Sequence, residues 1–198
     1  MLEVPPARVL VVYGSETGNS RRGVEKLVRY WMDQNDGSYE LTEADIVAGS
    51  KAPDAVAELR ERYDVLVVVT SSFGEGDPPA NFVPFFLTLH RAVAEGGSPL
   101  AGLQHAVLGY GNSVYPTFQN CPRLTDRMLG ELGSRRFVRR VELDEGQDEQ
   151  RDPAQDSQVA EGETRDLPAE LVPEIASGTP STAAWDSGSG GGGGGGGG

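Results

Sequence analysis

The chain has few of the residues that disulfides, metal centres and membrane spans require. Its single cysteine, Cys121, excludes an intramolecular disulfide, and its two histidines, His90 and His105, argue against a His-rich metal centre. No run of 18 apolar residues occurs, so no membrane-spanning helix is expected. The first residues, Met1–Ala7, include two prolines and lead into an apolar run, which does not resemble a signal peptide. We therefore expect a cytoplasmic protein without a membrane anchor.

Apolar runs alternate with helical stretches along most of the chain. Strands are expected at Val9–Tyr13, Tyr39–Ala44, Val65–Ser71, His105–Leu108 and Phe137–Leu143, and helices at Arg21–Asp33, Pro53–Tyr63, Asn81–Ala94 and Phe118–Leu132. Strands separated by helices of ten or more residues indicate a parallel sheet with helices on both faces. The sequence therefore predicts a doubly wound α/β domain with five parallel strands.

Three short loops containing glycine each follow one of these strands. They are Gly14–Ser20, Ser72–Pro79 and Gly109–Tyr115. In an open parallel sheet, ligands bind at the carboxyl ends of the strands, where the strand order reverses. We therefore expect the three loops to form one ligand site.

The first loop carries hydroxyls and backbone amides but no lysine. Its side chains Ser15, Thr17, Asn19 and Ser20 can donate to phosphate oxygens, and the amides that open the next helix point the same way. A P-loop would end in Gly-Lys-Ser/Thr, but this loop ends in Gly18-Asn19-Ser20, so a monophosphate suits it better than a magnesium triphosphate. The simpler interpretation is an N-cap box, for which one capping residue would be enough.

The second and third loops each carry an aromatic residue beside glycines. Phe73 precedes Gly74, and Tyr115 follows Gly111. Two rings on converging loops could enclose a flat ligand, with offset stacking adding about 0.5–1.5 kcal/mol per ring beyond area burial. Glycines beside them would let the backbone approach the edge of the ligand.

The acidic charge of the chain is concentrated near its end. The formal net charge is −13, and the residues from Glu142 onward hold 13 acidic and 2 basic side chains, which is −11. The remaining 141 residues hold 17 acidic and 15 basic side chains, which is −2. Arg21 and Arg22 follow the first loop, where they could neutralise a phosphate or be solvated helix residues. No basic patch with interleaved aromatics is evident, so nucleic-acid binding is not expected.

The three loops closely resemble those of flavodoxin, and most closely the FMN domain of the diflavin reductases. The resemblance covers residues 8–145 and rests on Tyr13–Asn19, Phe73–Pro79 and Gly109–Tyr115, in that order. It implies a flavodoxin-like fold with strand order 2-1-3-4-5 and FMN as cofactor. The FMN-binding residues that it implies are Ser15, Glu16, Thr17, Gly18, Asn19, Ser20, Ser72, Phe73, Gly74, Glu75, Gly76, Asp77, Leu108, Gly109, Tyr110, Gly111, Asn112, Tyr115, Phe118 and Asp144.

The resemblance also implies a function in electron transfer. The chain lacks a Gly-x-Gly-x-x-Gly motif after a strand, so no NADPH site is visible in it. We expect a monomer that takes electrons from a separate FAD/NADPH reductase and passes them singly to a haem or iron–sulfur protein. Two alternatives stay open: a stand-alone NAD(P)H:quinone reductase on the same fold, and a degenerate flavodoxin-like module that binds a partner but no flavin.

The end of the chain departs from the family pattern. Flavodoxin-like domains have a last helix after the fifth strand, but Glu145–Thr164 is rich in Asp, Glu, Gln and Gly and is expected to be disordered. A weak two-turn helix is expected at Leu167–Ile175, followed by a Ser- and Gly-rich stretch with a linker composition. We therefore expect one domain at residues 1–146 and a mostly disordered tail at residues 147–198.

Overall fold

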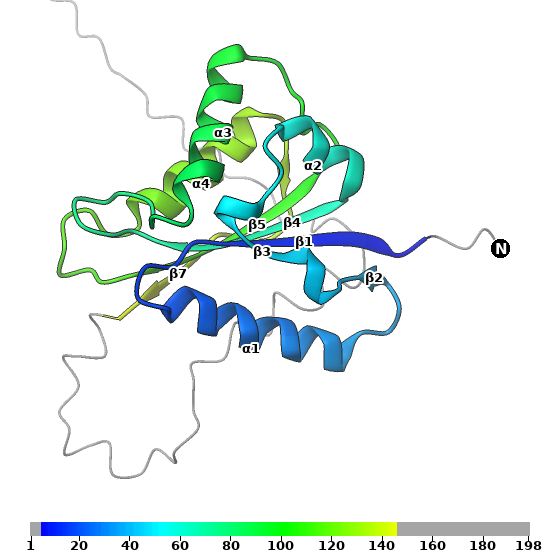
Figure 1. Cartoon of the computed structure of the whole chain (residues 1–198), viewed down its shortest axis with the longest axis horizontal. Helices are drawn as coiled ribbons and strands as arrows, with labels where there is room; N and C mark the ends of the chain where they lie inside the picture. The colour runs from blue at the N-terminus through cyan, green and yellow to red at the C-terminus, as the bar shows by residue number, and fades with distance from the viewer. Residues whose placement is uncertain (1–4, 146–198) are drawn as a thin grey trace, which may run out of the picture.

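The computed structural model describes residues 5–145, which form a parallel sheet between helices (Figure 1). The strands are β1 (Ala7–Tyr13), β2 (Tyr39–Glu40), β3 (Ile46–Ala48), β4 (Val65–Ser71), β5 (Gln104–Gly111), β6 (Arg135–Arg136) and β7 (Val141–Asp144). The order is β2-β1-β4-β5-β6, with β3 also beside β1 and β7 also beside β5, and every pairing is parallel. When β2 is counted with β3 and β6 with β7, the predicted order 2-1-3-4-5 is confirmed.

The second strand is interrupted, so the expected continuous strand Tyr39–Ala44 was wrong. A 3₁₀ turn, η1 (Glu43–Asp45), separates β2 from β3. Thr42 and Asp45 form a reciprocal capping box, in which the Thr42 amide donates to the Asp45 carboxylate at 3.0 Å and the Asp45 amide donates to the Thr42 side chain. This local pairing bends the chain before it rejoins the sheet as β3.

The fifth strand is also interrupted, at residues 137–140, so the expected strand Phe137–Leu143 was wrong in its first four residues and right at Val141–Leu143. The chain leaves the sheet after β6 and returns at β7. Arg136 ends β6 and Arg140 is the last residue before β7, and both bind the Asp126 carboxylate. Four residues of extended strand would separate their Cα atoms by about 13 Å, so the irregular path lets both side chains reach one acceptor.

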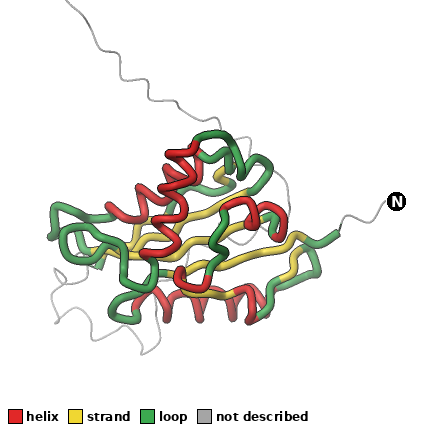
Figure 2. Tube along the Cα trace, turned by 45° about the horizontal axis from the view of Figure 1, so that its top comes forward, coloured by secondary structure: helices red, strands yellow, loops and turns green. Residues whose placement is uncertain are grey.

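The helices lie close to their expected positions and cover both faces of the sheet. They are α1 (Asn19–Gln34), α2 (Val56–Arg62), α3 (Val83–Glu95) and α4 (Asn120–Glu131), with a second 3₁₀ turn, η2 (Gly49–Lys51). Figure 1 shows α1 on one face and α2, α3 and α4 on the other, and Figure 2 shows the strands running side by side between them. Within residues 5–145, none of these helices is long and apolar enough to cross a membrane.

Alternate side chains of the central strands enter two hydrophobic cores. Leu10, Val12, Leu66, Val68 and Val107 pack toward α2, α3 and α4. Their sequence neighbours on β1, β4 and β5 pack toward α1, where Leu27 and Trp31 are buried. Both faces are therefore apolar, which explains the nearly continuous valine and leucine runs. The expected helix Leu167–Ile175 and the tail at residues 147–198 lie outside the described residues.

Two helical glycines give a matched test of packing against α1. A Cβ atom on Gly23 would stand 2.0 Å from the Tyr110 hydroxyl, whereas a Cβ atom on Gly130 meets nothing within 4 Å. We expect Gly23→Ala to lower the free energy of unfolding by about 1–3 kcal/mol, because the Tyr110 ring must move. Gly130→Ala should raise it by about 0.5–1 kcal/mol through helix propensity. Urea unfolding of both variants checks this, and equal effects would contradict the close Tyr110 packing.

Candidate functional site

The three loops meet at the carboxyl edge of the sheet because β1, β4 and β5 are neighbouring parallel strands. The first two loops are tied directly to each other. The Ser15 amide donates to the Asn81 side-chain oxygen at 2.9 Å, and the Ala80 amide donates to the Glu16 carboxylate at 3.0 Å. Glu16 therefore braces the second loop in this structure, while Asn81 orients the first.

The first loop turns sharply into α1 at Gly18. Gly18 has a φ of +94° and occupies the N-cap position, and its amide donates to the Ser15 hydroxyl oxygen at 3.0 Å. No acidic side chain lies in the first turn of α1, and the Thr17 side chain is exposed. The free amides at this helix start carry a partial positive charge, so the loop is suited to an anion.

Two of the polar side chains predicted to donate to a phosphate, Asn19 and Ser20, do not point into open space at the start of α1. Asn19 donates to the Glu145 carboxylate at 2.8 Å and accepts a hydrogen bond from Arg22, and Ser20 is buried. Both side chains would have to turn before donating to a ligand. Arg22 lies beside the loop, whereas Arg21 pairs with Glu25 at 3.1 Å, so Arg22 is the better placed of the two arginines.

The second loop is a tight turn that presents Phe73 to the outside. The Phe73 amide donates to the Asp77 carbonyl at 2.9 Å, and the Asp77 amide donates back to the Phe73 carbonyl at 2.8 Å. Gly74 and Gly76 have φ values of +54° and +97°, which other residues rarely adopt. Phe73 is 52% exposed, and Glu75 is exposed beside it.

The third loop presents Tyr115, which is 62% exposed. The Asp144 carboxylate accepts a hydrogen bond from the Ser113 amide at 2.9 Å, and the Glu145 amide donates to the Gly111 carbonyl at 2.8 Å. Asp144 is buried, so it positions the loop from behind rather than reaching out of it. The predicted residues on this loop are therefore brought to the same edge as Phe73.

Two of the predicted residues direct their side chains away from the loops. Leu108 is buried in the core on the α1 side, and the Tyr110 hydroxyl lies where a side chain on Gly23 would be. Burial raises the pKa of the Tyr110 phenol, and the nearby Glu145 charge adds to this. Only the backbone of Leu108 and Tyr110 is left for the predicted site.

The start of α4 holds the second and third loops together, which the sequence did not reveal. Gln119 is buried, has a φ of +61°, and donates to the Gly109 and Leu143 carbonyls at 3.0 and 3.1 Å. Asn120 donates to the Gly76 carbonyl at 3.1 Å, and the Cys121 amide donates to the Ser72 hydroxyl at 3.0 Å. Ser72 is therefore a bracing residue in this structure, and no local pattern marks Gln119 as one.

Phe118 connects the third loop to α4. A Cβ atom on Gly111 would stand 3.0 Å from the Phe118 ring, and the Arg123 guanidinium lies 5.8 Å from the ring centroid. Gly109 is confined more tightly, because a Cβ atom there would stand 1.8 Å from the Gln119 side-chain oxygen. These two glycines are required by close packing inside the loop region. Among residues 5–145, no group of three or more His, Cys, Asp or Glu side chains could hold a metal ion.

Fold and loops together define a doubly wound α/β protein with its ligand edge at the carboxyl ends of β1, β4 and β5. A family model described as flavodoxin matches residues 11–156, and the chain therefore belongs to the flavodoxin family. It is similar to solved flavodoxin structures: flavodoxin 1 of Bacillus cereus (TM-score 0.55, 19% identity, covering 70% of this chain and 84% of that one) and a Streptococcus pneumonia TIGR4 flavodoxin (TM-score 0.56, 22% identity, covering 70% and 85%).

The more similar sequences belong to larger proteins. The chain is 33% identical over 144 residues to NADPH-dependent diflavin oxidoreductase 1 of Gibberella zeae, covering 73% of this chain and 22% of that protein. It is 34% identical over 140 residues to the sulfite reductase [NADPH] flavoprotein alpha-component of Neisseria meningitidis, covering 70% and 21%. The chain thus spans about a fifth of the length of these curated relatives.

FMN is the cofactor that this family membership implies, and the residues at the loop edge fit it. The phosphate would meet the amides of α1's first turn and the exposed Thr17 side chain, with no carboxylate in that turn. Phe73 and Tyr115 stand more than half exposed on loops that are fixed by hydrogen bonds, so both faces are open to a flat ring. This edge of the sheet thus offers an anion site for the phosphate of FMN and two exposed aromatic side chains for its ring.

Proposed function

We propose that this chain is an FMN-binding electron-transfer module. The observation that carries the proposal is the pair of exposed aromatic side chains, Phe73 and Tyr115, at the same sheet edge as the amino end of α1. Large aromatic side chains this exposed, on loops this well braced, are available to a ligand rather than to the core. The family membership supports the same ligand.

The first loop has the role of holding the phosphate. The Thr17 hydroxyl and the amides after Gly18 donate to phosphate oxygens, and Ser15 keeps the loop closed through the Gly18 amide. Arg22 lies close enough to the loop to balance the phosphate charge. The binding energy is then concentrated on the end of the cofactor farthest from its reacting ring.

The second and third loops have the role of enclosing the ring. When bound, FMN supplies reversible one- and two-electron redox chemistry. Phe73 and Tyr115 pack on the ring and exclude water, which favours less charged forms of the cofactor. The left-handed and exposed Gly74 would let the backbone approach the ring edge without a side chain in the way, whereas the Gly76 amide and carbonyl bond to Phe73 and Asn120 and hold the loop in shape. Gly111 and Asn112 of the third loop would line the ring edge as well.

We propose an FAD/NADPH reductase domain or protein as the electron donor. Two relatives are named as NADPH-dependent flavoproteins, and their remaining four fifths lie beyond the part that matches this chain. A haem or iron–sulfur protein is the acceptor class that suits single-electron delivery. The reductase can be a domain of the same polypeptide or a separate protein.

Flavin titration of the purified protein tests the proposal. We expect yellow protein, and after stripping we expect FMN to rebind with a clear preference over riboflavin, because the first loop recognises phosphate. NADPH alone should leave the flavin oxidised, while NADPH with a catalytic amount of a diflavin-type FAD/NADPH reductase domain should bleach it. Bleaching by NADPH alone would favour the stand-alone quinone reductase. A protein that binds neither flavin would favour the interaction module.

A further inference from the structure

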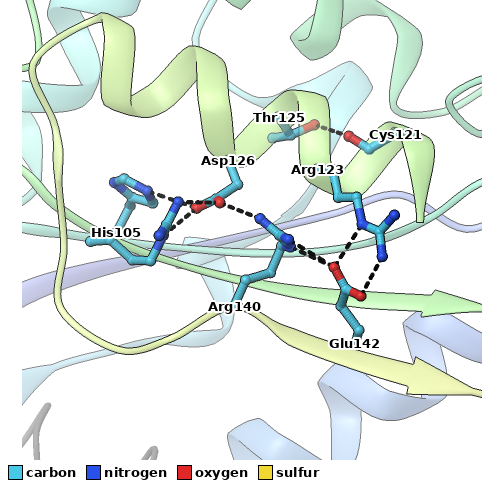
Figure 3. A network of polar contacts seen from close by, with 8 residues as sticks. His105, Cys121, Arg123, Thr125, Asp126, Arg140 and Glu142 are labelled. Atoms are coloured by element: carbon cyan, nitrogen blue, oxygen red, sulfur yellow. Dashed lines mark hydrogen bonds and ion pairs between the residues drawn. The ribbon is translucent and has the colours of Figure 1, made fainter. Parts of the chain in front are cut away.

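An arginine-lined hollow lies beside β7 and α4, outside the loop edge described above. It has a volume of about 450 Å³ and is lined by Arg123, Arg136, Arg139, Arg140 and Glu142. Arg123 comes from α4, and the others come from the irregular fifth strand. Figure 3 shows Arg123, Arg140 and Glu142 joined in one network with Asp126. The interruption of the fifth strand is what gathers these guanidinium groups.

Three of the four arginines, Arg123, Arg136 and Arg140, are held in place by two carboxylates. Asp126, whose side chain is 1% exposed, accepts hydrogen bonds from Arg136 Nε at 2.7 Å and Arg140 at 2.6 Å. Glu142 accepts from Arg123 at 2.9 and 2.7 Å and from Arg140 at 2.8 Å. Fixed guanidinium groups lose less conformational entropy when they bind a further anion, so this hollow is preorganised.

The hollow carries more positive charge than its carboxylates neutralise. Among residues 5–145, the four arginines of the hollow are accompanied by two carboxylates, Asp126 and Glu142, so its positive side chains outnumber the negative ones. Arg139 is exposed and makes no hydrogen bond or ion pair with any other residue in the range 5–145. Three guanidinium groups held in place beside the exposed Arg139 are suited to carboxylates, which Arg binds in a bidentate fashion.

We propose that the acidic segment 146–166 of this chain docks on the arginine hollow. This segment holds seven acidic side chains and two arginines, and it starts directly after Glu145, one residue past β7. Glu142 of β7 lines the hollow, so the segment begins next to the site it would occupy. A tethered segment has an effective concentration on the order of mM, which exceeds that of most free acidic partners.

Docking there would affect the neighbouring loop edge. Arg123 lines the hollow and also lies over the Phe118 ring, which packs on Gly111 of the third loop. The docked segment would place negative charge next to Arg123 and the Phe118 ring, and so next to the third loop. The docking itself depends only on the arginines and the acidic segment, not on flavin.

A spin label on the acidic segment of the full chain tests the docking. Ser157→Cys can be labelled selectively, because Cys121 is fully buried and desolvation raises its pKa to about 12. We expect paramagnetic broadening of the backbone amide signals of residues 135–142, and recovery of those signals in about 0.5 M NaCl because salt screens the attraction. Adding Arg139→Glu should largely remove the broadening, whereas Arg29→Glu, the same charge change on an exposed residue of α1, should leave it.

Two results would overturn the proposal. One is broadening that is spread equally over α1 and residues 135–142, or that persists unchanged in Arg139→Glu. The other is no broadening at the hollow in the full chain. If a hexaglutamate peptide then shifted the signals of residues 135–142, the occupant would be an acidic segment of another protein instead of this one.

Discussion

Asp126→Asn is expected to lower the free energy of unfolding by about 3 kcal/mol, the lower end of the range for breaking one side of a buried ion pair. The Asp126 carboxylate is buried and accepts from Arg136 and Arg140, and His105 Nε2 lies 3.2 Å from it. The substitution leaves three donors with a weaker, neutral acceptor. The arginines are about a quarter exposed, which lets water offset part of the loss.

Thermal and urea unfolding measure this effect. We expect a fall in Tm of about 10 °C for a domain of this size. Asp54→Asn is the matched control, because Asp54 is exposed and has no ion pair among the described residues. A change of the same size in both variants would show that Asp126 contributes no more than an exposed carboxylate.

The same network predicts an acid-sensitive stability. Burial alone would raise the pKa of Asp126, but hydrogen bonds from His105 and Arg136 outweigh it and lower the pKa to about 2. The hydrogen bond from Arg123 likewise lowers the pKa of Glu142 to about 2. Since both values lie below those of an unfolded chain, these groups stabilise the fold fully above about pH 5 and lose this contribution as the pH falls toward 2. In Asp126→Asn, the free energy of unfolding should therefore depend less on pH between about pH 5 and pH 2.

Thr17→Val is expected to weaken FMN binding by about 10- to 100-fold, since a hydrogen bond to a charged group contributes about 1.5–3 kcal/mol. Thr17 is exposed in the first loop and nearly isosteric with valine, so the loop itself should keep its shape. Riboflavin affinity should stay unchanged, because riboflavin lacks the phosphate. Fluorescence titration of both flavins measures the two constants.

The riboflavin titration separates a lost phosphate contact from a damaged loop. Thr88→Val, the same substitution on α3, gives a second control away from the loops. Equal weakening of FMN and riboflavin would mean that the substitution disturbs the fold of the edge. Unchanged FMN affinity would remove Thr17 from the phosphate site.

The sequence was sufficient for the features that depend on long local patterns. β4 was predicted with its observed bounds and β1 to within two residues, because apolar runs of five to seven residues buried on both faces are distinct. The three loops were found because their glycines and aromatics lie directly after such runs.

The features that depend on distant partners could not be predicted. The break in the fifth strand follows from Arg136 and Arg140 sharing Asp126, a contact that no local pattern contains. His105 was assigned no role, yet it is buried between Ser134 and Asp126. The left-handed backbone of Gln119 could not be predicted either, because the two carbonyls that its side chain binds lie on β5 and β7.

Three consecutive residues at the start of α4 make hydrogen bonds to both aromatic loops of the ligand edge. Gln119 holds β5 and β7, Asn120 holds the Gly76 carbonyl, and the Cys121 amide holds Ser72. A single local opening of this turn would remove hydrogen bonds from the loops after β4 and β5 together, and each loop would keep its own bonds, such as Ala80 to Glu16 and Ser113 to Asp144. Hydrogen exchange of the amides next to these shared contacts should therefore follow one opening event.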